Sequence, residues 1–226
     1  EEAPYWYRYN TLPSYIGASS LEPETMDTLQ LSTDFKTGRF LTHQITLFNQ
    51  DLKDLVYRNT TVTPAKYDNA GSVETRGLEY EVVFAQEKYS IKFNYTFLDL
   101  VDATVYPNNG DQINNIPEHA GNLIFDVNLL SSLWADISVN YIGERPSPIG
   151  NSTTSTYSRQ DLNHMEDDVA LLNMKLTWKD LFDGAIDLSA SVKNVTDEEW
   201  YQGGSTLLPY EQAGTWYLID CTYKWK

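Results

Sequence analysis

The sequence predicts an all-β fold, an antiparallel transmembrane β-barrel segment of about nine up-and-down strands with short periplasmic turns and long extracellular loops. Three observations support this fold class. Apolar and polar residues alternate with a period of two in one segment after another. The connections between these segments are short and long in turn. The apolar positions of a segment extend over about nine or ten residues, the length that a tilted strand needs to cross the hydrocarbon layer.

The alternation identifies the expected strands in order. Successive side chains of a strand point to opposite faces, so each segment has one apolar and one polar face. The fourth segment, YSIKFNYTFLDL, places Tyr89, Phe93 and Phe97 on one face, with Lys92 and Asn94 on the other. None of the segments has a convincing helical period. The expected strands cover residues 28–35, 41–47, 78–84, 89–100, 122–129, 133–141, 170–178, 186–193 and 217–225.

The lengths of the connections distinguish the two ends of the expected sheet, one with short turns and one with long loops. Short, hairpin-sized joins occupy residues 36–39, 86–88, 130–132 and 179–184. Long polar joins occupy residues 58–65, 101–115, 143–167 and 197–213. A β-sandwich has no need of this asymmetry, whereas outer-membrane barrels have short periplasmic turns and long extracellular loops. We therefore expect residues 1–24 to be an extracellular loop segment and residues 25–226 to hold the barrel strands.

The two faces of the strands are expected to meet different surroundings. In a membrane barrel the apolar face contacts lipid and the polar face lines a wet lumen. Opposite charges on neighbouring strands are expected chiefly to tie the lumen wall together. The lumen-facing candidates are Glu79, Glu81, Lys92, Asn94, Asp126, Asp136, Lys175 and Lys193. Aromatic residues at the ends of the apolar faces suit interfacial girdles, namely Phe35, Tyr57, Tyr89, Phe97, Tyr141, Trp178 and Trp225.

Composition excludes several classes of function but does not separate a membrane barrel from a soluble protein. Mean hydropathy is −0.45, and a barrel gives such an average because alternate residues face lipid. The net charge of −16 argues against a nucleic-acid partner. Cys221 is the single cysteine of the 226 residues, which excludes an intrachain disulfide. The acidic start EEAPYWYRYN lacks the apolar region of a signal peptide, so we expect a mature product, a fragment or a cytosolic protein.

Five short motifs occur in order along the chain. They are Leu21-Glu22-Pro23-Glu24 before Leu29; LFNQDLKDLV at 47–56; Asn69-Ala70-Gly71 before Arg76-Gly77-Leu78-Glu79; Ile116-Pro117-Glu118-His119; and Lys193-Asn194-Val195-Thr196-Asp197 before Trp200-Tyr201. In order and spacing over about 200 residues, these motifs resemble the C-terminal part of the barrel of TonB-dependent outer-membrane receptors. Two departures stand out: residues 212–215 replace the family's Pro-Gly-Arg, and Trp225 is penultimate rather than terminal.

The resemblance implies energy-coupled uptake of a large nutrient, such as an iron-siderophore, cobalamin or a glycan, across the outer membrane of a Gram-negative bacterium. It also implies a 22-stranded barrel around a plug domain, energised by a TonB-type protein. About nine strands fit this chain, so the remaining strands and the plug belong to the same polypeptide or to another chain. Outer-membrane lipid is the other partner. The ligand-contact candidates are the aromatic loop residues Tyr5, Trp6, Tyr7, Tyr9, Tyr15, Tyr106, Tyr157, Trp200 and Tyr210.

No catalytic constellation is found, so we expect neither an enzyme nor a cofactor. His43 falls on the apolar phase of its strand and is expected at an interface, and His119 reads as structural. The acidic loop around His164 can offer oxygen ligands to a divalent cation, although a solvated loop is the favoured interpretation. The candidate metal ligands are Asp161, Glu166, Asp167 and Asp168.

Three alternatives to a transport receptor stay open. A truncated receptor-like barrel would act as a structural subunit of an envelope complex. A small standalone outer-membrane barrel would serve as an adhesin or a porin, and would show heat-modifiable migration on its own. A soluble β-sandwich lectin would dissolve without detergent.

Overall fold

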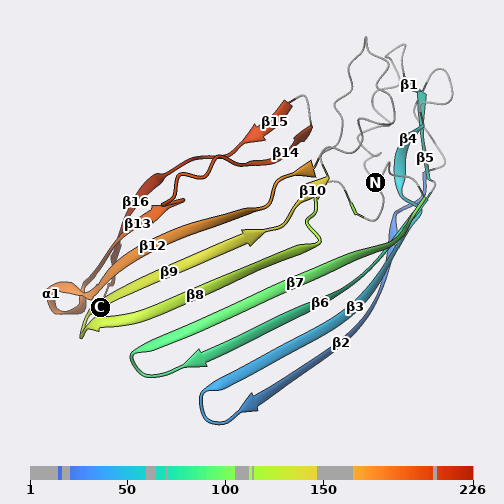
Figure 1. The fold of residues 1–226 in the computed structure, drawn as a ribbon. Helices are drawn as coiled ribbons and strands as arrows, with labels where there is room; N and C mark the ends of the chain where they lie inside the picture. Colours follow the sequence, from blue (N-terminus) through green and yellow to red (C-terminus); the bar gives the residue numbers. More distant parts are fainter. Residues whose placement is uncertain are drawn as a thin grey trace.

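The computed structural model describes residues 15–16, 21–59, 65–69, 71–104, 112–113, 115–146, 165–205 and 208–225. Its main element is a nine-stranded antiparallel sheet in the order β16-β13-β12-β9-β8-β7-β6-β3-β2 (Figure 1). In the described part of the chain, no helix is both long and apolar enough to cross a membrane. The predicted all-β, antiparallel fold of nine strands is confirmed.

Strands that follow one another among the nine are neighbours in the sheet, which makes the sheet an up-and-down meander with β2 and β16 at its edges. The period-two segments located all nine strands, and the structure extends several of them by a few residues toward the long loops. The strands are β2 (Thr25–Thr37), β3 (Leu41–Lys53), β6 (Ser72–Ala85), β7 (Tyr89–Ala103), β8 (His119–Leu130), β9 (Leu133–Ile142), β12 (Val169–Asp180), β13 (Ile186–Lys193) and β16 (Trp216–Tyr223).

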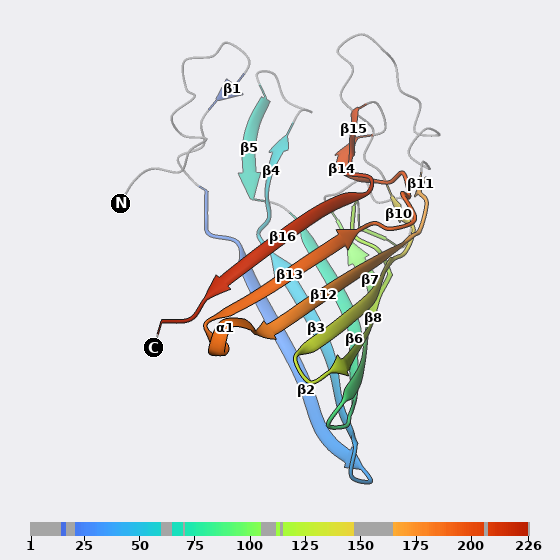
Figure 2. The same ribbon diagram turned by 90° about the vertical axis from the view of Figure 1, so that its left-hand side faces the viewer.

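Turns and long connections lie at opposite ends of the sheet, as predicted. The long connections carry small sheets of their own, which gather at the upper end in Figure 2. The element α1 (Leu181–Gly184) in the β12–β13 turn has left-handed backbone at Phe182 and Asp183, so it is a turn rather than a helix. β1 (Tyr15–Ile16) lies in the segment before β2. The short strands of the long connections are β4 (Val56–Asn59), β5 (Ala65–Asn69), β10 (Arg145–Pro146), β11 (Met165–Glu166), β14 (Tyr201–Ser205) and β15 (Leu208–Glu211).

The two faces of the sheet differ in exposure. On the apolar face, Leu176 is 50% exposed although β12 has a neighbour on each side. On the polar face, Thr46 and Ser191 are 6% and 5% exposed. Side chains crowd together on the inside of a curved sheet and spread apart on its outside, so we infer that the sheet curls around its polar face. Figure 2 shows the curl.

Gly77 on β6 lies on the polar face directly against the aromatic ring of Phe48. A Cβ atom at this position would collide with the ring of Phe48 on β3 and with the carbonyl oxygen of Phe97 on β7. Glycine in a strand commonly marks such a close approach. This contact gives a physical reason for the glycine of the Arg76-Gly77-Leu78-Glu79 motif.

A small apolar cluster lies at the end of the sheet that carries the long connections. Leu55, Val73 and Leu100 are 4%, 9% and 8% exposed and pack together, with Leu52, Ala103 and Ile113 around them. Ile113 comes from the connection between β7 and β8, so the cluster ties that connection to the strand ends. Elsewhere the sheet buries little apolar surface, as expected of strands whose apolar faces meet lipid.

Candidate functional site

The polar face carries a hollow over β3, β6 and β7. Its polar lining residues sit opposite one another: Glu81 pairs in register with Gln44 and Asn94, and Glu79 pairs with Thr46 and Thr96. The hollow has a volume of about 180 Å³ and is lined by Gln44, Thr46, Glu79, Tyr80, Glu81, Asn94, Tyr95 and Thr96. It is large enough to hold several water molecules, and its carboxylates favour a cationic or hydrogen-bond-donating occupant.

An ion pair borders this hollow. Lys92 Nζ lies 2.6 Å from Glu81 Oε2, with both side chains more than one-third exposed. The pair joins β6 to β7 diagonally on the polar face, which agrees with the expected role of such charges in tying the wall together. Exposed pairs of this kind contribute about 0–1 kcal/mol, so its effect is local.

A second charged group lies nearer the turn end of the polar face. Asp126 and Asp136 face each other in register across β8 and β9, and Lys175 on β12 pairs in register with Asp136. The hydroxyl of Ser90 donates to Asp126 Oδ2 at 2.9 Å. Strand phase also places Lys193 on this face. All eight lumen-facing candidates therefore share one face, although what that face meets in the complete protein stays a prediction.

A ladder of asparagine side chains crosses the middle of the polar face. Asn122 Nδ2 donates to Asn94 Oδ1 at 2.8 Å, and Asn140 Nδ2 donates to Asn122 Oδ1. Asn173 Nδ2 donates to Asn140 Oδ1 at 2.6 Å and its Oδ1 accepts from the backbone N–H of Asn194 at 3.1 Å. We call Asn94, Asn122, Asn140 and Asn173 the asparagine ladder. The network is not predicted from the sequence above, although asparagine recurs at the polar phase of successive strands, which is a signal of such a ladder.

Two of the short motifs, those that contain Asn69 and Asp197, form hydrogen bonds between segments that are distant in the sequence. Asn69 Nδ2 donates to the carbonyl oxygens of Glu22 and Asp54 at 2.8 and 2.7 Å, and its Oδ1 accepts from the Glu22 N–H at 2.6 Å. Near the last strand, Asp197 Oδ1 accepts from the Thr215 N–H at 2.7 Å, and Thr215 Oγ1 donates to the Asn194 carbonyl at 2.7 Å. The motifs therefore fix where loops leave and rejoin the sheet.

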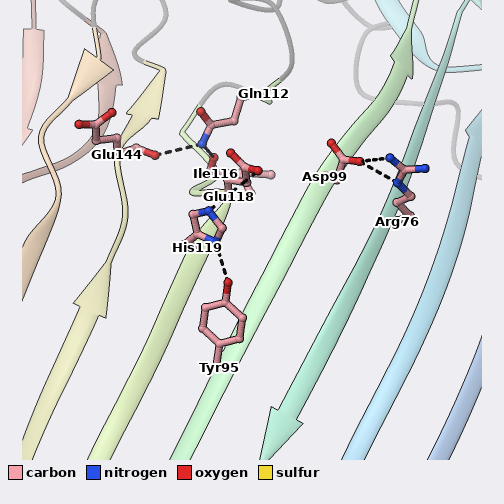
Figure 3. A network of polar contacts seen from close by, with 8 residues as sticks. All are labelled: Arg76, Tyr95, Asp99, Gln112, Ile116, Glu118, His119 and Glu144. Atoms are coloured by element: carbon pink, nitrogen blue, oxygen red, sulfur yellow. Dashed lines mark hydrogen bonds and ion pairs between the residues drawn. The ribbon is translucent and has the colours of Figure 1, made fainter.

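The loop ends of β6, β7 and β8 carry a further set of polar contacts (Figure 3). The Arg76 guanidinium pairs with Asp99 at 2.6 Å. The Tyr95 hydroxyl and His119 Nδ1 are 2.7 Å apart, and the His119 ring stacks on Phe97 at 5.3 Å between centroids. His119 thus has the structural setting that was expected. Likewise, His43 stacks on Phe35 on the apolar face, at 4.6 Å between centroids.

Of the predicted ligand-contact residues, two lie on one hairpin. Trp200 directly precedes β14 and Tyr210 lies in β15, and beside them the Gln212 N–H donates to the Trp200 carbonyl at 3.0 Å. Tyr210 is 64% exposed and Trp200 is half-buried. Tyr15 lies in β1, which pairs with β5 in another loop sheet. The candidates Tyr5, Trp6, Tyr7, Tyr9, Tyr106 and Tyr157 lie outside the described residues.

The possible metal site has no structural support within the described residues. Asp167 and Asp168 are exposed, and Glu166 lies in β11. Asp161 falls outside the part of the chain that the structure describes. Among the described residues, no group of three or more His, Cys, Asp or Glu side chains is placed to hold a metal ion.

Comparison with solved structures identifies the fold. The FrpB iron transporter of Neisseria meningitidis superposes with a TM-score of 0.71 at 13% identity, over 92% of this chain and 32% of that one. The siderophore receptor PirA of Acinetobacter baumannii gives 0.74 at 18% identity, over 92% and 33%. The ferripyoverdine receptor of the Pseudomonas aeruginosa outer membrane gives 0.66 at 15% identity, over 89% and 27%.

This chain thus spans between about a quarter and a third of the length of these proteins. No curated protein sequence matches it. The family model described as TonB dependent receptor-like, beta-barrel, matches residues 3–195, which is most of the chain. On this match, and on a nine-stranded antiparallel sheet of the same fold, the chain belongs to the TonB-dependent receptor-like β-barrel family.

Proposed function

We propose that this chain forms part of the wall and the capture loops of an outer-membrane receptor for energy-coupled uptake of a large nutrient. An iron-siderophore complex is the first candidate, with cobalamin or a glycan as alternatives of similar size. The observation that carries the proposal is the combination of the family match over residues 3–195 with a polar sheet face that ends in long loops. Proteins of this family are transporters and receptors rather than enzymes, and their barrels lie in the outer membrane of Gram-negative bacteria.

The choice of an iron-siderophore complex rests on the solved structures of similar fold. Their names describe an iron transporter, a siderophore receptor and a ferripyoverdine receptor. The loops of this chain offer compatible chemistry, since Tyr210 is an exposed aromatic residue of β15 and Trp200 directly precedes β14 on the same hairpin. Tyrosine and tryptophan pair an apolar ring with a polar group and suit the contact of large ligands at wet surfaces.

The edges of the sheet support a barrel completed by further strands. β2 and β16 have one neighbour each among the described strands, and both run from the loop end to the turn end. Joining them directly would create a parallel pair, whereas bacterial barrels are antiparallel with even strand numbers. Antiparallel closure therefore requires an odd number of additional strands. Since an open edge in lipid leaves backbone groups unsatisfied, these strands are proposed as obligatory partners.

The remaining partners follow from energy-coupled uptake. A plug domain would fill the lumen against the polar face, and a TonB-type protein would act through that plug. Outer-membrane lipid would contact the apolar face, where Leu31 and Leu47 are 70% and 49% exposed. We further propose that residues 1–24 are an extracellular loop segment and residues 25–226 the strand-bearing part.

Transport by the bacterium that encodes the chain tests this proposal. The gene is deleted, and uptake of radioiron-labelled catecholate and hydroxamate siderophores, labelled cobalamin and labelled oligosaccharides is measured under starvation. We expect deletion to abolish uptake of one of these compounds, and an uncoupler of the proton-motive force to abolish the same uptake in the wild type. Unchanged uptake of every compound after deletion would contradict the proposal. Uptake that is lost on deletion but insensitive to the uncoupler would contradict energy coupling.

A further inference from the structure

Three long connections meet at residues Gly143, Glu144, Arg145 and Pro146, which we call the loop junction. Arg145 is 2% exposed, and Pro146 is fully buried. A buried guanidinium has to be hydrogen bonded, because an unpaired charge in a desolvated site is strongly unfavourable. The partners of Arg145 therefore indicate which segments this residue holds together.

The guanidinium of Arg145 bridges two of the connections. Nη1 donates to the carbonyl oxygen of Gly143 at 3.1 Å, within the connection from β9 to β12. Nη2 donates to the carbonyl oxygen of Tyr201 at 2.9 Å, in the connection from β13 to β16. The planar guanidinium offers donors in a fixed fork, so one side chain can hold two carbonyl groups in a defined relative position.

The third connection, from β7 to β8, forms hydrogen bonds to the loop junction as well. The Asn115 N–H donates to the Pro146 carbonyl at 2.8 Å. Gln112 Nε2 donates to the carbonyl oxygens of Ile116 and Glu144 at 3.1 and 3.0 Å (Figure 3). Backbone and side-chain contacts therefore connect this loop to the residues on either side of Arg145.

The loop junction is itself fixed to the sheet. The Gly143 N–H donates to the His119 carbonyl oxygen at 2.8 Å, where β8 begins. A Cβ atom at Gly143 would lie 2.7 Å from that oxygen, so only glycine allows this approach. The junction thus rests on a rigid strand, and the three connections are held against it.

We propose that Arg145 is a positioning residue for ligand capture, which couples the three connections and holds the hairpin β14–β15 in its capture position. This inference rests on the proposed function. Ordering flexible segments during binding costs affinity, and segments that are ordered beforehand avoid much of this cost. Arg145 acts through Tyr201, the first residue of β14, so Trp200 and Tyr210 are the side chains that it orients toward a ligand.

The first experiment measures loop order without any ligand. In the intact protein in outer-membrane vesicles, Cys221→Ser removes the thiol of this chain, any cysteine outside residues 1–226 is likewise replaced by serine, and nitroxide labels are attached to cysteines at Ile116 and Tyr210. Ile116 is 39% exposed and Tyr210 is 64% exposed, so both accept a label. The distance distribution is recorded by pulsed electron paramagnetic resonance for wild type, Arg145→Met and Arg145→Lys. The matched control is Arg76→Met, because Arg76 is 64% exposed and its ion pair with Asp99 lies away from the junction.

We expect a broader distribution for Arg145→Met, an intermediate one for Arg145→Lys, which keeps the charge without the fork, and no change for the control. The second experiment measures uptake of the radioiron-labelled catecholate siderophore by cells carrying the unlabelled variants. For Arg145→Met, the half-saturation concentration should rise about tenfold at an unchanged maximal rate. A folding defect alone would lower the maximal rate through the amount of assembled protein.

The outcomes separate the two proposals. An unchanged distance distribution in assembled Arg145→Met overturns the coupling role, and broadening with an unchanged half-saturation concentration overturns the role in capture. Heat-modifiable migration reports assembly. If Arg145→Met does not assemble, Gln112→Ala decides the matter, since it removes two loop hydrogen bonds and should broaden the distribution to a smaller extent. If the wild type takes up no tested compound, the proposed function fails while the distance measurement still tests the coupling.

Discussion

Asn122 and Asn140 lie directly opposite each other on β8 and β9, and the side-chain amide of Asn140 donates a hydrogen bond to the side-chain oxygen of Asn122. Asn94 and Asn173 extend this contact on either side. Each amide offers a donor and an acceptor, so the same residue type can continue the chain of hydrogen bonds from strand to strand. The ladder thereby links neighbouring strands through side-chain hydrogen bonds across the polar face.

Replacement of Asn173 by alanine tests the ladder. The change leaves Asn140 Oδ1 and the Asn194 N–H without their partner, and we expect the free energy of unfolding to fall by about 1–3 kcal/mol. Urea unfolding in detergent micelles, followed by tryptophan fluorescence, measures it. Asn128→Ala is the matched control, since Asn128 makes a single side-chain contact of 3.5 Å to the Leu133 carbonyl. Equal effects of the two substitutions would contradict a specific role of the ladder.

Neighbouring residues of β7 test which face meets lipid. Phe93 lies on the apolar face and Asn94 lines the polar hollow. With nitroxide labels at these positions in a Cys221→Ser background, we expect position 93 to be more accessible to oxygen, which dissolves in lipid. Position 94 should be more accessible to a water-soluble nickel chelate. Continuous-wave power saturation measures both accessibilities, and the reverse order would show that the polar face does not line a wet lumen.

Trp200 and Tyr210, on the hairpin β14–β15, are expected to contribute to ligand capture. Tyr210→Ala and Trp200→Ala should each raise the half-saturation concentration for siderophore uptake about tenfold or more, because aromatic anchors carry a large share of binding energy. Tyr217→Ala is the control, since Tyr217 is 74% exposed on the apolar face of β16. If the control variant shows the same rise, the effect comes from barrel integrity rather than from ligand contact.

Gly77→Ala tests the close approach of β3 and β6. A methyl group here meets the Phe48 ring and the Phe97 carbonyl oxygen, and overpacking of this kind costs about 1–3 kcal/mol. We expect a lower urea midpoint for Gly77→Ala and partial recovery in Gly77→Ala with Phe48→Leu, since the smaller side chain relieves one of the two contacts. Phe48→Leu alone provides the reference. If the changes in urea midpoint caused by Gly77→Ala and by Phe48→Leu simply add in the double variant, contact with Phe48 is not the cause of the destabilisation by Gly77→Ala.

The C-terminal end of the sheet predicts a dependence of stability on alkaline pH. Lys224 Nζ lies 2.8 Å from Asp187 Oδ1 and 2.9 Å from Asp180 Oδ1. These hydrogen bonds, that to Asp187 first, raise the pKa of Lys224 above its ordinary value of 10.5. Since the pKa is higher in the folded state, the stabilisation is complete below the unfolded pKa and disappears as pH rises through the folded pKa.

Lys224→Met is therefore expected to lower the urea midpoint at neutral pH, and the difference from wild type should shrink as the pH rises beyond 10.5. Comparison of the two proteins cancels the ionisation of tyrosines, which both contain. A difference that stays constant up to strongly alkaline pH would show that the ammonium charge is not the source of the stabilisation.

Much of the fold could be predicted because the relevant signal is local. In YSIKFNYTFLDL, alternation alone places Phe93 and Asn94 on opposite faces, since the geometry of an extended strand does not depend on its neighbours. The same reasoning placed all eight charged and amide candidates on one face. It also located the turns, because glycine and polar residues interrupt the alternation where the chain reverses.

The contacts between the long connections could not be predicted from the alternation of polar and apolar residues. In the sequence, Arg145 is marked only by the proline that follows it in a long connection, and this pattern does not indicate a buried side chain. Its partner carbonyl belongs to Tyr201, 56 residues further along the chain. The contact exists only because β9, β12 and β13 lie side by side and bring the two connections together.

The sequence by itself determined which residues form strands, which face each side chain shares and at which end the long connections lie, because these properties follow from short-range backbone geometry and polarity. Only the tertiary structure decided that four asparagines join into a ladder, that Phe48 covers Gly77 and that Arg145 bridges two connections. Those contacts depend on strand register and on the meeting of loops that are distant in the chain, and no local pattern encodes either.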